Sequence, residues 1–142
     1  MHDLTSEAKF FLALARAQSL LYRRFDAGLG GISFNWFIIM YHLSRAEGER
    51  LRRIDLADKL GLTASGVTRL LGPMEKIGLV RSEPSAHDAR VSIIALAPGG
   101  KRKLQEAIED LEVRAEELIP EGDRSQLAGM ADLMNGIAAR AK

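Results

Sequence analysis

The sequence contains no cysteine among its 142 residues. This absence excludes disulfides, a cysteine nucleophile, cysteine-ligated zinc and a thiol redox switch. Long apolar runs are also missing, because the longest unbroken one, Trp36 to Tyr41, is too short to cross a bilayer. The first residues lack a basic segment followed by an apolar one, so we expect no secretory signal, no membrane partner and a cytoplasmic protein.

The composition that remains is that of a folded globular chain. Hydrophobic residues make up 46% and charged residues 27%, which excludes wholesale disorder. The length fits one domain, or one domain with a helical extension. A chain of this size buries roughly 70% of its unfolded surface, so it needs no metal or disulfide for stability.

The net charge of +1 hides an uneven distribution. Residues 50–103 hold eleven basic and five acidic residues, a net of +6, whereas the rest of the chain carries −5. A basic middle between acidic flanks is typical of a polyanion-binding module between oligomerisation arms. An unevenly charged but functionless surface is the alternative.

Apolar spacing and breaker residues predict mostly helices with one hairpin. In the first helix, apolar residues recur in steps of four and three, and the second is apolar nearly all round and therefore central. The last two helices carry heptad-like seams. The predicted helices cover residues 3–27, 34–45, 52–60, 64–77, 101–119 and 123–141, and the predicted strands cover 79–84 and 91–96.

Two short helices around Gly61 predict a helix-turn-helix. Thr63 caps the second helix, in which Val67, Leu70, Leu71 and Met74 form the inward face. The outward residues are short except for one arginine, which suits a helix lying in the major groove of DNA. These outward residues are Ala64, Ser65, Thr68 and Arg69.

The strand pair that follows predicts a wing with a basic tip. His87 and Arg90 at this tip suit a minor groove, where negative potential attracts cations. Asp88 would repel phosphate if it pointed outward, so we expect it to support the wing as an internal partner of an arginine. The alternative is a surface hairpin with incidental charges.

Five segments, found together and in this order, resemble the MarR family of winged-helix transcriptional regulators. They are residues 55–62, 65–71, 74–80, 88–90 and 96–100, the last two matching the family's Asp-x-Arg and Leu-Thr-x-x-Gly signature. The order of helices agrees over the whole chain, although the arms match by pattern rather than by motif.

The resemblance implies a mainly α fold with a small β wing, in which N- and C-terminal dimerisation helices flank a winged helix-turn-helix. We expect a dimerisation region at residues 1–32 and 101–142 and a DNA-binding domain at 33–100. The resemblance also implies a homodimer whose first and last helices interlock. Its two recognition helices would bind a pseudo-palindromic operator on double-stranded DNA, with repression relieved by a small molecule.

Three positions depart from the family's pattern. Ala97 stands where threonine is usual, so we expect a weaker helix cap. Ala89 replaces a second wing arginine, which leaves minor-groove contact to Arg90. Pro73 lies inside the recognition helix, where it removes a backbone donor, so we expect a kinked or tightened last turn.

The candidate DNA contacts divide into positioning and reading groups. We expect base contacts from Ser65, Thr68 and Arg69. Phosphate contacts come from basic side chains and hydroxyl groups: Arg52, Arg53, Lys59, Arg81 and Thr63.

The family's effector pocket lies where the dimerisation helices meet the winged domain. An arginine beside aromatic rings would suit an aromatic carboxylate. The alternative is that Trp36 and Met40 are core residues and that Arg16 pairs with an acid. The candidate pocket residues are Arg16, Trp36, Met40, Tyr41 and His42.

Motifs of catalysis are lacking. Ser65 is not in a Gly-x-Ser-x-Gly elbow, because Thr63 occupies the first glycine position. The glycines at 28, 30 and 31 follow a helix rather than a strand, unlike a dinucleotide loop. The three histidines, His2, His42 and His87, lack metal-ligand spacing. We therefore expect no enzyme, cofactor or metal.

Two other functional classes stay open. The modest net charge and Pro73 are compatible with a winged-helix module that binds a protein and has lost specific DNA recognition. A small-molecule-binding helical enzyme is the more remote alternative.

Overall fold

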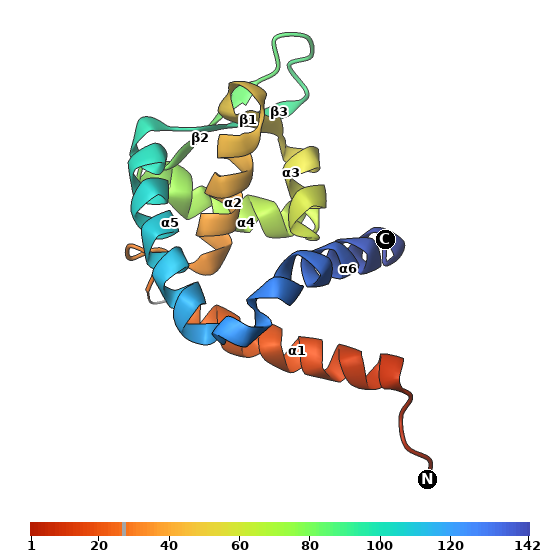
Figure 1. The fold of residues 1–142 in the computed structure, drawn as a ribbon. Helices are drawn as coiled ribbons and strands as arrows, with labels where there is room; N and C mark the ends of the chain where they lie inside the picture. Colours follow the sequence, from red (N-terminus) through yellow and green to blue (C-terminus); the bar gives the residue numbers. More distant parts are fainter. Residues whose placement is uncertain (27) are drawn as a thin grey trace. The chain divides into compact units, whose positions relative to one another are not determined.

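The computed structural model describes residues 1–26 and 28–142, and these form a mainly helical fold with one small antiparallel sheet (Figure 1). Two compact units, Met1–Asp110 and Leu111–Lys142, divide the chain within its fifth helix. The elements, with η marking 3-10 turns, are α1 (Ser6–Phe25), α2 (Phe34–Arg45), η1 (Glu47–Glu49), β1 (Arg50–Arg52), α3 (Arg53–Leu60), α4 (Ala64–Lys76), β2 (Val80–Pro84), β3 (Ser92–Leu96), α5 (Pro98–Leu118), η2 (Glu121–Gln126) and α6 (Leu127–Arg140).

The second helix has the bounds that the sequence predicts. Ser33 caps α2 by accepting a hydrogen bond from the Trp36 amide at 3.2 Å. Ile39, Met40 and Leu43 are fully buried, so α2 forms the centre of the first unit. The first helix begins at Ser6 after its cap Thr5. Its predicted end, Ala27, lies outside the described residues.

The sheet has three strands rather than the predicted two, in the order β1-β3-β2. The hairpin prediction is confirmed, with Val80 opposite Leu96 and Pro84 opposite Ser92. The extra strand, β1, pairs along the other edge of β3. Sequence patterning missed β1 because a single leucine between two arginines has no readable alternation.

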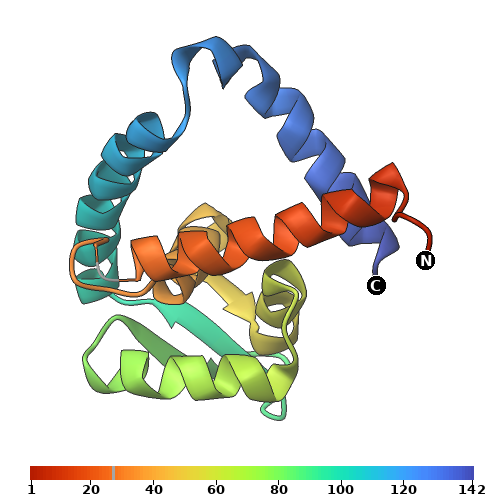
Figure 2. The ribbon, with the colours of Figure 1, turned by 90° about the horizontal axis from the view of Figure 1, so that it is seen from below.

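The predicted helix-turn-helix is present. Gly61 ends α3 in the left-handed conformation, with φ of +67°. Val67, Leu71 and Met74 then bury the inner face of α4, which packs beside β2 (Figure 2). The helix continues through Pro73 to its last residue, Lys76, beyond which an i to i+3 bond from the Gly78 amide to the Glu75 carbonyl tightens the chain.

The helix predicted over residues 101–119 begins earlier than the sequence indicates, because Pro98, Gly99 and Gly100 belong to it rather than separating it from the wing. These residues form the first turn of α5, where the missing N–H of proline costs nothing. Ala97 precedes this turn and has no hydroxyl with which to cap it. Gly100 packs so tightly that an added Cβ would overlap the Leu79 carbonyl oxygen and lie 2.7 Å from Leu96 Cδ1.

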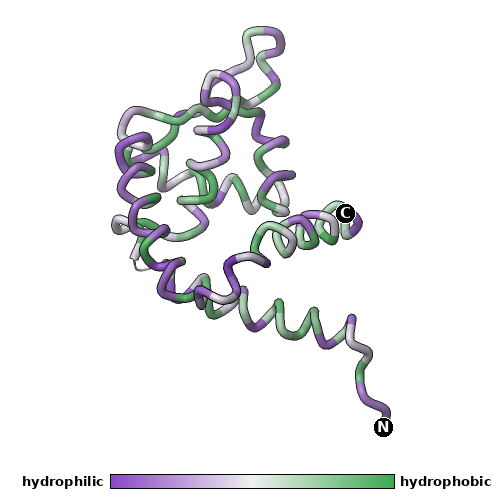
Figure 3. Tube along the Cα trace, in the orientation of Figure 1, coloured by the Kyte–Doolittle hydropathy of each residue, from purple (hydrophilic) through white to green (hydrophobic). Residues whose placement is uncertain are grey.

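Both terminal regions expose apolar side chains, visible as recurrent hydrophobic positions along α1 and along α6 (Figure 3). On α1, Phe11 is 51% and Leu12 61% exposed. On α6, which starts four residues after the predicted helix, Met130 is 53% exposed. No helix in the part of the chain described here is both long enough and apolar enough to cross a membrane.

Replacing Gly100 with alanine tests the tight packing of α5 against the chain before β2. We expect Gly100→Ala to lower the free energy of unfolding by about 1–3 kcal/mol, because the methyl group overpacks a rigid backbone carbonyl. The matched control is Gly129→Ala in α6, where an added Cβ meets nothing within 4 Å. That helical position should gain roughly 0.5–1 kcal/mol. Equal urea midpoints for the two variants would contradict the packing explanation.

Candidate nucleic-acid interface

The first turn of α4 is ordered by its own hydroxyl groups. Thr63 Oγ1 accepts a hydrogen bond from the Gly66 amide at 3.1 Å and lies 3.2 Å from Ser65 Oγ. Both residues are exposed, so this turn presents hydroxyls and unpaired helical N–H groups to the outside. Such a helix start favours a phosphate oxygen.

Arg69 follows on the exposed face of α4. Within residues 1–26 and 28–142, its side chain has no hydrogen bond or ion pair. A free guanidinium on a recognition helix can reach the O6 and N7 atoms of guanine with two parallel hydrogen bonds. The structure therefore leaves Arg69 available for the reading role that the sequence predicts.

Arg52 is more constrained than the sequence suggests. Its Nε lies 2.8 Å from Asp55 Oδ2, and its Nη2 lies 3.0 Å from Asp55 Oδ1. These bonds lower the pKa of Asp55 and raise that of Arg52. More than half of the Arg52 side chain stays exposed, so its remaining donors can still meet a phosphate.

Arg53 lies half-buried at the start of α3, and its guanidinium contacts three hydroxyl groups. Nη1 donates to Thr68 Oγ1 at 3.1 Å, and Nη2 donates to Ser82 Oγ at 3.3 Å. Ser92 Oγ lies 3.4 Å from both Nε and Nη2. Arg53 thus joins the recognition helix to both wing strands, a role that sequence reasoning missed.

The wing tip projects beyond the helices (Figure 1). Asp88 accepts from the Arg90 backbone amide at 2.9 Å and pairs with the Arg90 guanidinium at 3.2 Å. The side-chain bond is the main reason that the pKa of Asp88 is lowered, with the backbone bond second. Arg90 nevertheless keeps 91% of its side chain exposed, and His87 is exposed beside it. Asp88 therefore holds the arginine without covering it.

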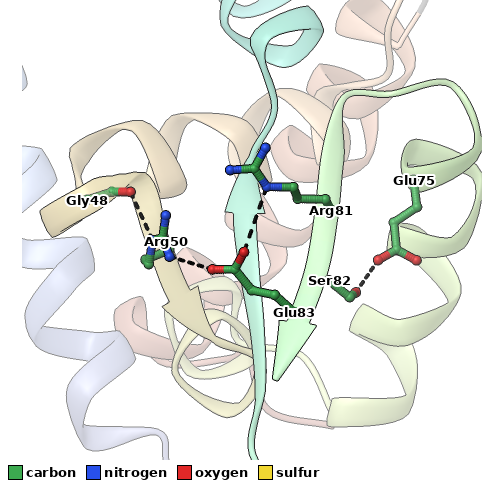
Figure 4. Close-up of polar contacts among 6 residues, drawn as sticks. All are labelled: Gly48, Arg50, Glu75, Arg81, Ser82 and Glu83. Atoms are coloured by element: carbon green, nitrogen blue, oxygen red, sulfur yellow. Dashed lines mark hydrogen bonds and ion pairs between the residues drawn. The ribbon is translucent and has the colours of Figure 1, made fainter. Parts of the chain in front are cut away.

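The base of the wing carries a second charged cluster (Figure 4). Glu83 on β2 binds Arg50 at 2.5 Å and lies 3.8 Å from Arg81 Nε. Ser82 donates to Glu75 at the end of α4. Among the residues that the structure describes, Arg81 is thus an exposed cation with one distant carboxylate, whereas Arg50 is paired at the sheet edge. Sequence reasoning missed Arg50 and Glu83, because their pairing depends on strand β1.

Four of the five candidate effector residues lie on α2, where Tyr41 and His42 are in edge-to-face contact with ring centres 6.1 Å apart. Met40 is fully buried, Tyr41 stacks on Phe37 with ring centres 6.0 Å apart, and Arg16 is exposed on α1. Trp36 is half-buried on α2. The burial of Met40 supports the alternative that it belongs to the core.

His42 lines a cavity of about 480 Å³ between α2, β1 and α3. Cationic side chains predominate around it: Arg45, Arg50, Arg52 and Lys59, with Glu47 and Asp55 as the acids. Burial lowers the pKa of His42, and the charge of Lys59 lowers it further. Groups of three or more histidine and carboxylate side chains able to hold a metal are lacking in the described part of the chain.

The pH dependence of stability tests the burial of His42. Its pKa is lower in the folded chain than in the unfolded chain, so below a pH of about 6.5 the folded state binds fewer protons than the unfolded state does. Wild-type stability should fall between pH 7.5 and pH 5 more steeply than that of His42→Gln. Urea unfolding at several pH values measures this difference, with His87→Gln as the exposed-histidine control. Parallel profiles for wild type and His42→Gln would contradict it.

Comparison with known proteins places these features in context. Residues 30–91 match the model of the MarR family. No match was found among curated proteins. The solved structures that resemble the chain include the transcriptional regulator BldR from Sulfolobus solfataricus, which is 24% identical, with a TM-score of 0.81 over 95% of this chain and 99% of that one.

Two further similar structures contain bound molecules. The M. tuberculosis transcriptional regulator MosR, in complex with DNA, is 27% identical, with a TM-score of 0.70 over 92% of this chain and 95% of that one. NadR in complex with 4-hydroxyphenylacetate is 21% identical, with a TM-score of 0.73 over 97% and 96%. The helix-turn-helix and the first part of the wing, within residues 30–91, are thus similar to the MarR family, and the chain shares the fold of these solved neighbours.

Proposed function

We propose that this protein is a homodimeric, sequence-specific DNA-binding regulator that acts in the cytoplasm as a repressor. The observation that carries the proposal is the free Arg69 guanidinium on the exposed face of α4, one turn from a hydroxyl-rich helix start. The DNA complex of MosR, a protein with the same fold, supports it.

The contacts follow from the geometry of the site. Arg69 reads guanine, and Ser65 reads a base edge or binds a phosphate at the helix start together with Thr63. Arg52 and Arg81 bind phosphates on either side of the recognition helix. Arg90 and His87 enter a minor groove, where Asp88 keeps the arginine extended.

The dimer follows from the exposed apolar faces. Three leucines and one phenylalanine on α1, and two leucines and one methionine on α6, are exposed in the single chain, which is unfavourable unless a second copy covers them. A two-fold dimer would place its recognition helices about 34 Å apart, the distance between successive major grooves. An operator with two inverted half-sites matches this symmetry.

The effector is a small anion, for which an aromatic acid is the best-supported class. The cavity at His42 falls within the usual range for a small ligand, roughly 300–1,000 Å³. Arg45 and Lys59 supply positive charge there, and NadR, with the same fold, is bound to an aromatic acid. Arg52 lines the same cavity and is a phosphate contact, so a bound anion would compete with DNA for its charge.

Removing the reading arginine tests the role of Arg69. The operator is first identified by selecting bound sequences from a random duplex library, in which an inverted repeat is expected. Arg69→Ala should then weaken binding by about 1–3 kcal/mol per guanine contact and relax preference at that base pair only. Arg102→Ala, which removes the same charge from α5, is the control. Equal weakening on all sequences would instead assign Arg69 to phosphate.

Salt separates DNA binding from the protein-interaction alternative. Each phosphate neutralised should contribute a slope of about −0.9 to the plot of log affinity against log salt concentration. The arginines of the interface therefore predict a steep fall in affinity, measured by fluorescence anisotropy between 50 and 300 mM salt. A flat response, or no inverted repeat from the selection, would favour a module that binds a protein.

A further inference from the structure

The hydroxyl of Thr68 is already used inside the protein. Thr68 Oγ1 donates its single proton to the Ala64 carbonyl, 3.0 Å away and one turn earlier in α4. The same oxygen accepts the bond from Arg53 Nη1 at 3.1 Å. A threonine hydroxyl has one proton and two lone pairs, so Thr68 has no proton left for a base edge.

Besides one lone pair of the hydroxyl oxygen, the group that remains for a partner is the methyl of Thr68. A threonine in a helix divides between two rotamers, because its hydroxyl can bond to either of two earlier carbonyls. Arg53 stabilises the rotamer that turns the oxygen toward α3 and the wing. Thr68 is exposed on the outward face of α4, so its Cγ2 methyl faces the surroundings as an apolar group.

Arg53 is itself held in place by the wing. Ser82 donates its proton to Glu75, so its oxygen is an acceptor for Arg53 Nη2 at 3.3 Å (Figure 4 shows the Ser82–Glu75 bond). Ser92, on the neighbouring strand, receives Nε and Nη2 at 3.4 Å. Three hydroxyls from α4, β2 and β3 therefore fix the guanidinium of one half-buried arginine.

We propose that Arg53 is a positioning residue that holds Thr68 with its methyl toward the major groove, where Thr68 recognises thymine through the C5 methyl of that base. The inference rests on the proposed function, because it assumes that α4 enters the major groove. It replaces two expectations from the sequence: a hydrogen bond from Thr68 to a base and a phosphate contact from Arg53. Apolar contact with the thymine methyl is the only direct readout that needs neither donor nor acceptor.

The test removes the methyl from the DNA and from the protein separately. In the operator recovered by selection, each thymine is replaced in turn by deoxyuridine, which differs only by the C5 methyl. At one position per half-site, wild-type affinity should fall roughly fourfold, the value of one buried methyl group. Thr68→Ser, which lacks the methyl, should not distinguish the two duplexes. Thr68→Val, which lacks the hydroxyl, should still distinguish them.

A second variant tests Arg53. Glutamine keeps two hydrogen-bond donors but lacks the charge and the planar set of N–H groups of the guanidinium. Arg53→Gln should therefore reduce the discrimination between thymine and deoxyuridine at that same position. The salt dependence of binding should stay unchanged. If Arg53 contacts a phosphate instead, the loss of that contact in Arg53→Gln should reduce the salt slope by about one for each protomer. Arg81→Gln, which removes an exposed cation from β2, should show this reduced slope and serves as the matched control.

The possible results distinguish a failure of the proposed function from a failure of this inference. A wild-type protein that binds no duplex overturns the proposed function and this inference with it. A wild-type protein that binds its operator but responds to no thymine-to-deoxyuridine replacement overturns only this inference. Discrimination kept by Thr68→Ser and lost by Thr68→Val would show that the hydroxyl reads the base. A reduced salt slope for Arg53→Gln would return Arg53 to a phosphate.

Discussion

The packing of one face of α4 is the constraint on which the rest of the structure depends. Val67, Leu71 and Met74 are buried to 1% exposure or less, so the helix cannot rotate without exposing them. This fixed rotation determines that Thr68 and Arg69 lie outside. Burying those three side chains stabilises the fold and, in the same step, decides which residues can meet a partner.

Polar contacts then orient the side chains that this packing leaves on the outer face. Two aspartates each hold an arginine: Asp55 holds Arg52, and Asp88 holds Arg90. Arg53 joins the recognition helix to the two strands of the wing. These pairs are exposed or half-buried, so each contributes little to stability. Their main consequence is geometric, since they set which cations extend outward and which are used inside the protein.

The sequence predicts most of the fold because periodicity and capping are local. The bounds of α2 and the turn at Gly61 follow from Ser33, from the apolar run and from a glycine that tolerates positive φ. Strand β1 was missed because three residues, Arg50–Arg52, become a strand only through pairing with β3. The start of α5 was misplaced because proline and glycine look like a break, although Pro98 fits a first turn and Gly100 a close contact.

The site is less predictable than the fold, for a related reason. Exposure of Arg69 follows from its place on a helix whose opposite face is apolar, and local sequence contains that information. The hydrogen bonds of Arg53 cannot be predicted from local sequence, because its partners Ser82 and Ser92 lie 29 and 39 residues away. Neither serine stands in a sequence pattern that predicts such a contact. The cavity at His42 likewise needs β1, so the sequence named His42 as an effector residue but not the residues of β1 and α3 that line the cavity with it.

The central claim is that two copies of this chain place their recognition helices in successive major grooves on one side of the duplex. Hydroxyl-radical footprinting of the selected operator measures this most directly. We expect two protected patches related by two-fold symmetry, with centres about 10 base pairs or a multiple of that number apart. A single unsymmetrical patch, or none under conditions in which the purified protein is dimeric, would contradict it.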